Sequence, residues 1–548
     1  MFSGDTSDPS DLSPAAVAAA RERRKESKAS AKLAKSAKRS AAAAEAAAAA
    51  ALAARPLPFA ASPPARPWGD YGLIRSSTRS SRVYSPVAAL PSLEGQAALV
   101  RARVHSVRSK GGGSFLVLRE AGTLDTVQAA HFKKSDAEHG GDVARYIAGL
   151  PAESIVDVEG VVVPAQVRSC TLSTHELAVS SIHAVSRASP PPFTVEDAAR
   201  SSEVVEASQA TERPFPRLGQ ELRLDSRWLD LRTPSSSSIL RVRSAVCQLF
   251  REALYAEGFA EIQTPKLLPG ESESGAGVFR TDYFGSPACL AQSPQLHKQM
   301  CISGDAGRVF EVGPVFRAEN SNTRRHLCEF TGLDFEMEIK ESYEEALEVA
   351  HGTFKHIFEG LETRWARDLS AIRSQYPSSP VLVTDDPCVL HWREGQEILA
   401  EEGFDMGDGM QDLTGKQELA LGRVVREKYG TDFFILHKYP ASIRPFYTMK
   451  CPDDPNYSNS YDMFIRGLEI SSGAQRCHDV GMLVENIEAK GIEDWEGSLG
   501  KYVDSFRHGI SPHAGAGIGL ERVVFLFLGL DNVRKATIFP RDPNRIKP

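Results

Sequence analysis

Short hydrophobic runs dominate the first third of the chain after its N-terminal segment. Between residues 98 and 182, runs rich in Val, Ile and Leu are separated by turns that contain Gly, Pro or Ser, a pattern typical of strands. The expected strands are Ala98 to His105, Ser114 to Arg119, Val127 to Ala129, Ile155 to Val163 and Glu176 to Ile182. Five short strands predict a small β-barrel, although the edge of a β-sandwich would fit the pattern equally well.

A helical pattern begins farther along the chain. Between Ile239 and Glu257, apolar residues recur on one helical face, and Gly258 is suited to end the helix. The apolar residues of that face are Val242, Val246, Leu249, Phe250 and Leu254. The residues from Phe259 onward predict a strand, which Pro265 ends.

Segments rich in Pro and Ser lie at residues 55–94 and 189–221, and they predict linkers. The expected organisation follows from these boundaries. It consists of a basic, alanine-rich extension and linker at 1–94, a barrel at 95–188, a linker or hinge at 189–221 and a main domain at 222–548.

Composition narrows the class of protein. With 548 residues, 42% hydrophobic and 25% charged, the chain has enough apolar residues for a large core and for more than one domain. We expect neither a signal peptide nor a membrane span, because the N-terminus is acidic and no long apolar run is present. The eight cysteines form no Cys-x-x-Cys pair, which argues against zinc or a disulfide framework and favours the cytoplasm.

Charge is concentrated near the N-terminus. Residues 21–40 carry nine Lys or Arg and two Glu, a local balance of plus seven in a chain whose net charge is −7. The surrounding alanines favour a helix. Two interpretations remain open: a solvated arm, or a helix that forms on an RNA backbone without reading its sequence.

Two segments carry residues suited to a nucleotide. The first runs from Phe316-Arg317-Ala318-Glu319 to Phe330, and the second from Gly515 to Arg522. Each supplies an arginine, whose planar fork matches phosphate oxygens, and Phe330 offers an aromatic face to a base. The two segments resemble motifs 2 and 3 of the class II aminoacyl-tRNA synthetases.

The resemblance extends over roughly residues 95–548. The segment from Arg223 to Arg232 is similar to the entry of the class IIb catalytic domain, and Ile239 to Pro265 is similar to motif 1. It implies an α+β fold, with a class II antiparallel-sheet catalytic domain and an N-terminal OB-fold barrel. Motif 1 implies a homodimer whose interface includes Pro265.

The resemblance also implies the residues of the site. Arg317, Arg476 and Arg522 would be catalytic; Arg317 would bind the α-phosphate and Arg522 the γ-phosphate, while Glu521 is expected to support an arginine. The ATP residues would be Arg317, Glu319, Arg325, His326, Leu327, Phe330, Glu469, Gly519, Leu520, Glu521 and Arg522. Glu469, Ser472 and Asp462 would hold Mg2+, whose preferred ligands are hard oxygens.

For the amino acid, the resemblance implies L-aspartate. Lys298 and Arg476 would bind its side-chain carboxylate, and Asp334 and Glu273 its ammonium group. The full set would be Glu273, Gln295, Lys298, Asp334, Ser472 and Arg476. Asparagine would leave both cations poorly paired, so we expect its rejection to be electrostatic.

The implied RNA partner is tRNA(Asp). Phe115 would stack on an anticodon base and Gln128 would pair with a base edge, unless Phe115 belongs to the barrel core. The expected activity is that of a cytosolic ligase that joins aspartate to tRNA(Asp) through aspartyl-adenylate. The alternatives are an asparagine-specific ligase, a catalytically silent RNA-binding relative, and a ligase that makes asparagine from aspartate and ammonia.

Overall fold

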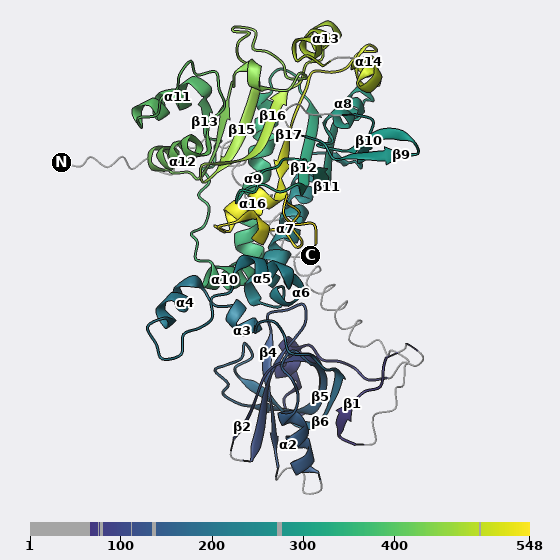
Figure 1. Ribbon diagram of the computed structural model, residues 1–548, viewed down its shortest axis with the longest axis vertical. Helices are drawn as coiled ribbons and strands as arrows, with labels where there is room; N and C mark the ends of the chain where they lie inside the picture. The colour runs from purple at the N-terminus through teal and green to yellow at the C-terminus, as the bar shows by residue number, and fades with distance from the viewer. Residues whose placement is uncertain are drawn as a thin grey trace, which may run out of the picture. The chain divides into compact units, whose positions relative to one another are not determined.

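The computed structural model describes residues 66–74, 76, 81–110, 112–133, 139–270, 277–492 and 495–547. The chain divides into two compact units between Pro190 and Pro191, which are drawn in Figure 1. The basic segment at residues 21–40 and Glu273 lie outside the described residues. Among the described residues, no helix is long and apolar enough to cross a membrane.

The N-terminal unit is a closed barrel. Strand β5 pairs with both β2 and β6, which closes the ring in the order β2-β3-β4-β6-β5. Its elements are β1 (Trp68–Asp70), η2 (Val87–Leu93), β2 (Ala97–Lys110), β3 (Gly113–Arg119), β4 (Thr126–Phe132), α2 (Gly140–Ala148), β5 (Ile155–Pro164) and β6 (His175–Ser186). All five expected strands are confirmed, and ring closure decides for a barrel over a sandwich edge.

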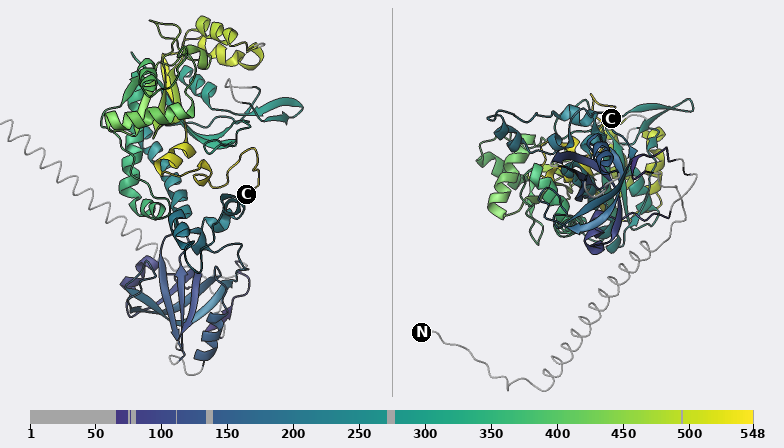
Figure 2. Two further views of the ribbon diagram at one scale, coloured as in Figure 1. Left: turned by 60° about the vertical axis from the view of Figure 1, so that its left-hand side comes forward. Right: turned by 90° about the horizontal axis from the view of Figure 1, so that it is seen from below.

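Three features of the barrel match the OB-fold. The five strands close in its order, β4 and β6 run parallel, and α2 follows the third strand of the barrel. Alternate residues such as Leu116 and Leu118 point into the core. Figure 2 shows the barrel from two further directions.

The described part of the predicted first linker packs on the barrel. Strand β1 adds to β6 in parallel, and Val87 and Leu90 of η2 are fully buried in the barrel core. The second predicted linker, in turn, contains two short helices and belongs to the C-terminal unit. Gln375 fixes it by donating from Nε2 to the carbonyl of Ala198, at 2.8 Å. The Pro- and Ser-rich composition gave no sign of these buried anchors.

The C-terminal unit is built on an eight-stranded sheet in the order β13-β14-β15-β16-β17-β12-β11-β7, antiparallel except at its two edges. The strands of the unit are β7 (Ala260–Glu261), β8 (Leu267–Leu268), β9 (Arg280–Tyr283), β10 (Ser286–Leu290), β11 (Arg308–Phe316), β12 (Glu329–Glu338), β13 (Val389–His391), β14 (Phe433–His437), β15 (Ser460–Ile465), β16 (Leu468–Gln475) and β17 (His513–Gly519). Strands β8, β10 and β9 form a separate small sheet.

The helices of this unit are α3 (Val195–Ala198), α4 (Ser202–Ser208), α5 (Gln220–Asp225), α6 (Arg227–Asp230), α7 (Pro234–Ala256), α8 (Gln295–Ser303), α9 (Glu344–Arg364), α10 (Ala366–Gln375), α11 (Trp392–Glu401), α12 (Gly415–Tyr429), η3 (Ala441–Ile443), α13 (Val480–Ala489), α14 (Trp495–Ser498), α15 (Gly500–Phe506), α16 (Leu520–Phe527) and η4 (Val533–Lys535). Helices α7, α9 and α16 pack their apolar residues against one face of the large sheet. Leu333 and Phe335 of β12 belong to that core, whereas Asp334 points to the other face.

The elements of the motif 1 region differ in length from their predictions. Helix α7 starts earlier, at Pro234, because the Thr233 side chain caps it by accepting from the Ser236 amide. Strand β7 is only two residues long. Beyond it, the Glu311 carboxylate accepts from the amide and hydroxyl of Thr264, so a side chain replaces the neighbouring strand as hydrogen-bond partner.

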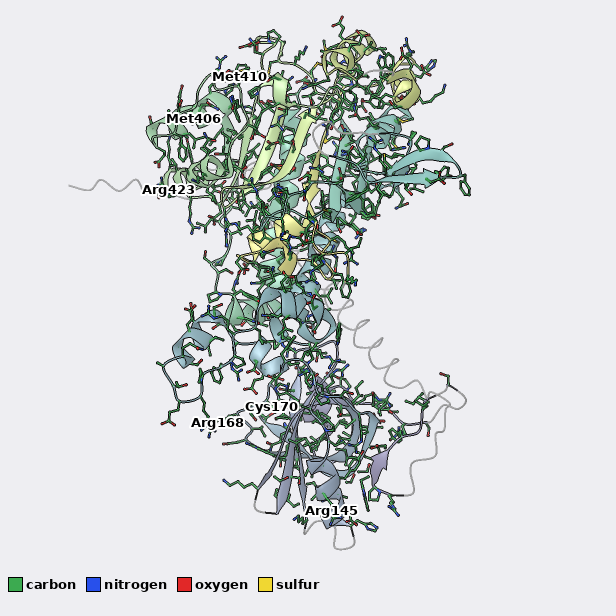
Figure 3. All side chains as sticks on the ribbon, viewed as in Figure 1. Arg145, Arg168, Cys170, Met406, Met410 and Arg423 are labelled. Carbon is green, nitrogen blue, oxygen red and sulfur yellow. The ribbon has the colours of Figure 1, made fainter. Side chains whose placement is uncertain are left out.

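A second apolar core joins α11 and α12 to the edge of the large sheet. Trp392 is buried there and donates from Nε1 to the Gly409 carbonyl, at 2.9 Å. Met406 and Met410 lie in the loop between the two helices, and Arg423 lies on α12 (Figure 3). At Gly422 a Cβ atom would lie 2.2 Å from Cα of Gly467, so α12 rests directly on the backbone of a turn.

We expect Gly422→Ala to destabilise the C-terminal unit by about 1–3 kcal/mol, because the turn must move to admit the methyl group. Gly352→Ala is the matched control, since Gly352 is also helical and has open space at its Cβ position. The control should be neutral or stabilising by up to about 1 kcal/mol. Thermal unfolding of both variants tests the contact, and equal melting temperatures would contradict it.

Candidate functional site

A polar cavity of about 470 Å3 lies in the C-terminal unit. Most of the residues predicted for ATP, metal and amino acid line this one cavity, although they are far apart in sequence. They are Gln295, Arg317, Glu319, Arg325, His326, Leu327, Phe330, Asp334, Asp462, Glu469, Ser472, Arg476, Gly519, Glu521 and Arg522. The predicted nucleotide and amino-acid residues therefore form a single site.

Two predicted residues do not reach the cavity. Leu520 is fully buried in the apolar core at the start of α16. Lys298 is also fully buried and lies behind the cavity wall, where its Nζ is 3.1 Å from Asp334 Oδ1 and 3.7 Å from Glu336 Oε2. In this arrangement Lys298 neutralises acidic side chains, and its direct contact with a substrate stays a prediction.

Strand register places two acids against two glycines. Asp334 of β12 pairs with Gly517 of β17, and Glu336 pairs with Gly515. A Cβ atom at Gly515 would lie 2.2 Å from the Phe335 carbonyl and 2.5 Å from Glu336 Oε2. Both glycines make room for acidic side chains of the neighbouring strand.

A β-bulge brings Glu469 and Ser472 to the same face of β16. The two residues are three positions apart, so a regular strand would place their side chains on opposite faces. Opposite them, Asp462 pairs with Ser472 and Phe464 pairs with Glu469, with a register shift between the two pairs. The extra residue in β16 turns both side chains toward the cavity.

Glu336 is a central residue that our sequence analysis did not single out. Its carboxylate accepts from Arg476 Nε at 2.9 Å and from Arg476 Nη2 at 3.2 Å, and it is fully buried. Burial raises its pKa, but Arg476 and Lys298 outweigh burial and lower it. Burial also raises the pKa of Asp334, against the opposing effect of Lys298. The alternation of β12 was the available signal, because it places Glu336 on the same face as Asp334.

Arg444 is the second residue that the sequence did not reveal. Its guanidinium donates to both Asp462 oxygens, at 2.8 and 3.0 Å, and to Ser472 Oγ at 2.9 Å. It also stacks on the Tyr439 ring, with its central carbon 3.8 Å from the ring centroid. Two of the three predicted metal ligands are therefore held by a cation of the protein itself.

The metal prediction depends on the charge around Glu469. Asp412 and Asp462 line the same part of the cavity. Burial, opposed by Arg522 and reinforced by Asp462 and Glu418, raises the pKa of Glu469 to about 7. A divalent cation at these oxygens would offset the carboxylate repulsion. No three His, Cys, Asp or Glu side chains among the described residues are placed to hold a metal together.

The predicted nucleotide end contains an unpaired cation. Arg317 forms no ion pair with any described residue, and its buried Nε has no hydrogen-bond partner there. Its guanidinium lies 5.6 Å from the Phe330 ring centroid. Because an unpaired cation is costly even at a partly buried position, Arg317 favours an anionic ligand.

Other residues at the predicted nucleotide end interact with side chains of the protein itself. Arg325 donates to Glu418 of α12 at 2.9 Å. Burial and the nearby Arg522 lower the pKa of His326, which favours a neutral imidazole. The expected support of an arginine by Glu521 is confirmed: Glu521 accepts from Arg243 Nη2 at 2.9 Å.

The barrel presents a separate polar surface. Phe115 is absent from the barrel core and lies on the outer face of β3, with Arg108 5.5 Å from its ring centroid. Arg108 also donates to Gln128 Oε1 at 3.2 Å, and Gln128 donates to Glu176. Register confirms the shared face, because Phe115 and Val117 pair with Ala130 and Gln128. Phe115 and Gln128 therefore share the outer face of the sheet, where Phe115 is partly exposed and Gln128 is only 7% exposed.

Comparison with known proteins identifies the family. Residues 219–543 match the model described as tRNA synthetases class II (D, K and N). The chain belongs to the class II tRNA synthetases. Enzymes of this family are ligases that use ATP. The cavity of this synthetase therefore contains the residues of its motifs 2 and 3.

Individual relatives of the synthetase match most of its length. The cytoplasmic aspartate–tRNA ligase 2 of Arabidopsis thaliana is 47% identical over 453 residues, which is 82% of this chain and 80% of that protein. The cytoplasmic aspartate–tRNA ligase of Homo sapiens is 46% identical over 486 residues, 88% of this chain and 94% of that protein.

Solved structures have the same fold. The aspartyl-tRNA synthetase of Entamoeba histolytica has a TM-score of 0.80 and 42% identity, covering 90% of this chain and 98% of that chain. The asparaginyl-tRNA synthetase of Pyrococcus horikoshii, complexed with asparaginyl-adenylate, has a TM-score of 0.72 and 29% identity. The match covers 84% of this chain and 98% of that chain. These neighbours support the predicted α+β fold with its class II catalytic domain.

We expect Phe330→Ala to raise the KM of the synthetase for ATP by about tenfold or more, because it removes an aromatic face for adenine and the surface beside Arg317. Phe330→Tyr keeps the ring and should stay close to the parent enzyme. Steady-state ATP titration of both variants is the measurement. An unchanged KM for the alanine variant would remove Phe330 from the nucleotide site.

Proposed function

We propose that the synthetase is an aspartate–tRNA ligase that activates L-aspartate with ATP and transfers it to tRNA(Asp). The observation that carries this proposal is the amino-acid end of the cavity, where Arg476 and Gln295 meet Asp334 beside the nucleotide residues. Relatives at 46–47% identity are named aspartate–tRNA ligases, and their cytoplasmic names support the same location here.

Free donors and acceptors in the cavity fit an amino acid with two carboxylates. Arg476 uses Nε and Nη2 for Glu336, Gln295 and Gly515, while its Nη1 has no hydrogen-bond partner among the described residues. This nitrogen is available to the side-chain carboxylate of aspartate. Asp334 lines the cavity and would receive the ammonium group, with Glu273 proposed as the second acid for that group.

The phosphate end would bring the α-phosphate to the aspartate carboxylate. Arg317 would bind both groups, and Arg522, which donates to the Glu469 carbonyl at 3.1 Å, would bind the γ-phosphate. Glu469, with Ser472 and Asp462, fits Mg2+, because these are oxygen ligands in an acidic surrounding. Bound there, Mg2+ would neutralise phosphate charge.

The reaction balances without a strongly basic side chain. A carboxylate oxygen attacks the α-phosphorus, and pyrophosphate leaves to give aspartyl-adenylate. The terminal 3′-hydroxyl of the tRNA then attacks the activated carbonyl, AMP leaves, and a phosphate oxygen accepts the proton. The side chains of the cavity hold and orient these groups.

Three alternatives are less well supported. The asparagine-specific synthetase structure shares the fold at 29% identity, below the 46–47% of the aspartate-named relatives. A catalytically silent relative would be expected to lose its phosphate or metal residues, yet Arg317, Glu469 and Arg522 all line the cavity. The barrel argues against a ligase that makes free asparagine.

We expect the parent enzyme to catalyse ATP–pyrophosphate exchange with aspartate and not with asparagine. Arg476→Ala should lower the aspartate-dependent exchange by about 100-fold or more, because a charged hydrogen-bond donor is lost and Glu336 loses its nearer cationic partner. Arg423→Ala is the matched control, since Arg423 is exposed on α12. Exchange near the parent rate in a folded Arg476→Ala enzyme would contradict the proposed pocket.

Recognition of tRNA(Asp) is proposed for the outer face of the barrel. Phe115 offers a ring to an unpaired base, and Arg108 and Gln128 add a cation and an amide beside it. These are the side-chain types that bind single-stranded bases. The basic N-terminal segment is proposed to add contacts to the RNA backbone that do not depend on sequence.

Phe115→Ala should raise the KM for tRNA(Asp) by about 5- to 100-fold, because stacking contributes about 1–3 kcal/mol per base. Exchange measured without tRNA should be unchanged, since the variant leaves the cavity intact. Phe115→Tyr retains the ring and serves as the control. Equal tRNA titrations for the alanine variant and the parent would refute the anticodon assignment.

A homodimer is proposed from motif 1 and from the apolar residues exposed near it. Tyr255 on α7, Leu267 beside Pro265 and Phe284 at the tip of the β9–β10 hairpin are 53%, 48% and 93% exposed. The views agree that this hairpin projects from the unit (Figures 1 and 2). A second copy of the chain would cover these side chains.

A further inference from the structure

A buried chain of hydrogen bonds lies behind the amino-acid end of the cavity. Gln295 lines the cavity, whereas Gln299 of α8, Tyr502 of α15 and His513 of β17 do not. Gln299 and His513 are fully buried, and Tyr502 is 3% exposed. These three side chains do not line the cavity, and their hydrogen-bonded connection to it runs through Gln295.

The donor and acceptor of each of these buried hydrogen bonds can be assigned in only one consistent way. Gln299 Oε1 accepts from Gln295 Nε2 at 3.2 Å and from the Tyr502 hydroxyl at 3.0 Å. The amide nitrogen of Gln299 therefore points the other way, to His513 Nε2 at 3.0 Å. An amide nitrogen only donates, so His513 Nε2 must accept and carries no proton.

The other ring nitrogen completes the assignment. His513 Nδ1 lies 2.8 Å from the Ser511 carbonyl, which only accepts, so the proton sits on Nδ1. Burial lowers the pKa of His513, which favours the same neutral ring. The other groups facing it are the carboxylate of Glu336 and the cations or rings of Arg476, His478 and Phe506.

The donor-to-acceptor direction of these hydrogen bonds continues to the proposed substrate pocket. Gln295 Nε2 also donates to Glu336 Oε2 at 3.2 Å, so its Oε1 is left to accept from Arg476 Nη2, at 3.2 Å. If the Gln295 amide were reversed, its nitrogen would face the guanidinium of Arg476, and two donors would meet. The orientation of this amide thus decides whether Gln295 adds an acceptor for Arg476, beside Glu336 and the Gly515 carbonyl, or opposes its guanidinium.

We propose that neutral His513 is a positioning residue, which fixes the amide of Gln299, and through it that of Gln295, so that Arg476 is held with Nη1 toward the aspartate carboxylate. This role rests on the proposed function, because it concerns the aspartate end of the same cavity. Tyr502 supports it by donating to the same oxygen of Gln299.

Variants of His513 separate positioning from packing. His513→Leu removes the acceptor for Gln299 and should raise the KM for aspartate by about tenfold, with the KM for ATP within about twofold. His513→Gln can present an amide oxygen to Gln299 and should recover most of the aspartate affinity. A side chain with a merely structural role would not separate the two substrates in this way.

Gln299→Glu provides a second variant with nearly unchanged volume. Its carboxylate still accepts from Gln295 and Tyr502, but His513 can donate to it and also keep its bond to the Ser511 carbonyl only when the ring is protonated. The KM for aspartate should therefore be raised at pH 8 and fall toward the parent value at pH 6, by about tenfold. In the parent enzyme, the KM for aspartate should not fall in this way between pH 8 and pH 6.

The assay is aspartate-dependent ATP–pyrophosphate exchange by the full chain, with both substrates titrated at pH 6 and pH 8. The inference is overturned if folded His513→Leu and Gln299→Glu match the parent KM for aspartate, or if both KM values rise together. No exchange by the parent enzyme would instead contradict the proposed function.

Tyr502→Phe, which deletes one hydroxyl, should raise the KM for aspartate by about 2- to 10-fold, and a folded variant with an unchanged KM counts against the inference.

Discussion

Mutual neutralisation of four buried charges is the constraint on which the site depends. Lys298 and Arg476 on one side and Asp334 and Glu336 on the other are each at most 5% exposed. None of them would be tolerated singly at such burial, because an unpaired charge there is far more costly than a paired one. Their pairing with each other keeps a cation beside the cavity before any substrate arrives, and the glycines of β17 supply the space for both acids.

The opposite end of the cavity is organised by a different balance. There the acids Asp412, Asp462 and Glu469 are offset by Arg444 and Arg522 within the same wall. Arg444 donates to both oxygens of Asp462, and burial raises the pKa of both Asp412 and Glu469. Of these two acids, Glu469 is the one that the sequence predicted as a ligand for a divalent cation. The bulge in β16 matters here, because without it Glu469 and Ser472 would not share a face.

Much of the fold could be predicted from the periodicity of apolar residues, and much of the site from the residue types in the motifs. The barrel strands and helix α7 were predictable because their faces alternate between core and solvent. Glu336 and Arg444 were harder to find, since their roles come from pairing with residues 140 and 18 positions away. The burial of Lys298 was also hidden, because sequence indicates a cation without saying whether strands β12 and β17 will enclose it.

Selectivity for a side-chain carboxylate must then arise from few groups. The asparaginyl-tRNA synthetase of Pyrococcus horikoshii shares the fold with a TM-score of 0.72, so the backbone does not separate the two substrates. An amide and a carboxylate differ little in size but differ in charge and in hydrogen-bond direction. In the proposed pocket, Arg476 would pair with the charge of the carboxylate, and the oriented amide of Gln295 helps to align Arg476. Nη1 of Arg476 has no hydrogen-bond partner among the described residues, and a carboxylate would satisfy this donor better than the neutral side chain of asparagine.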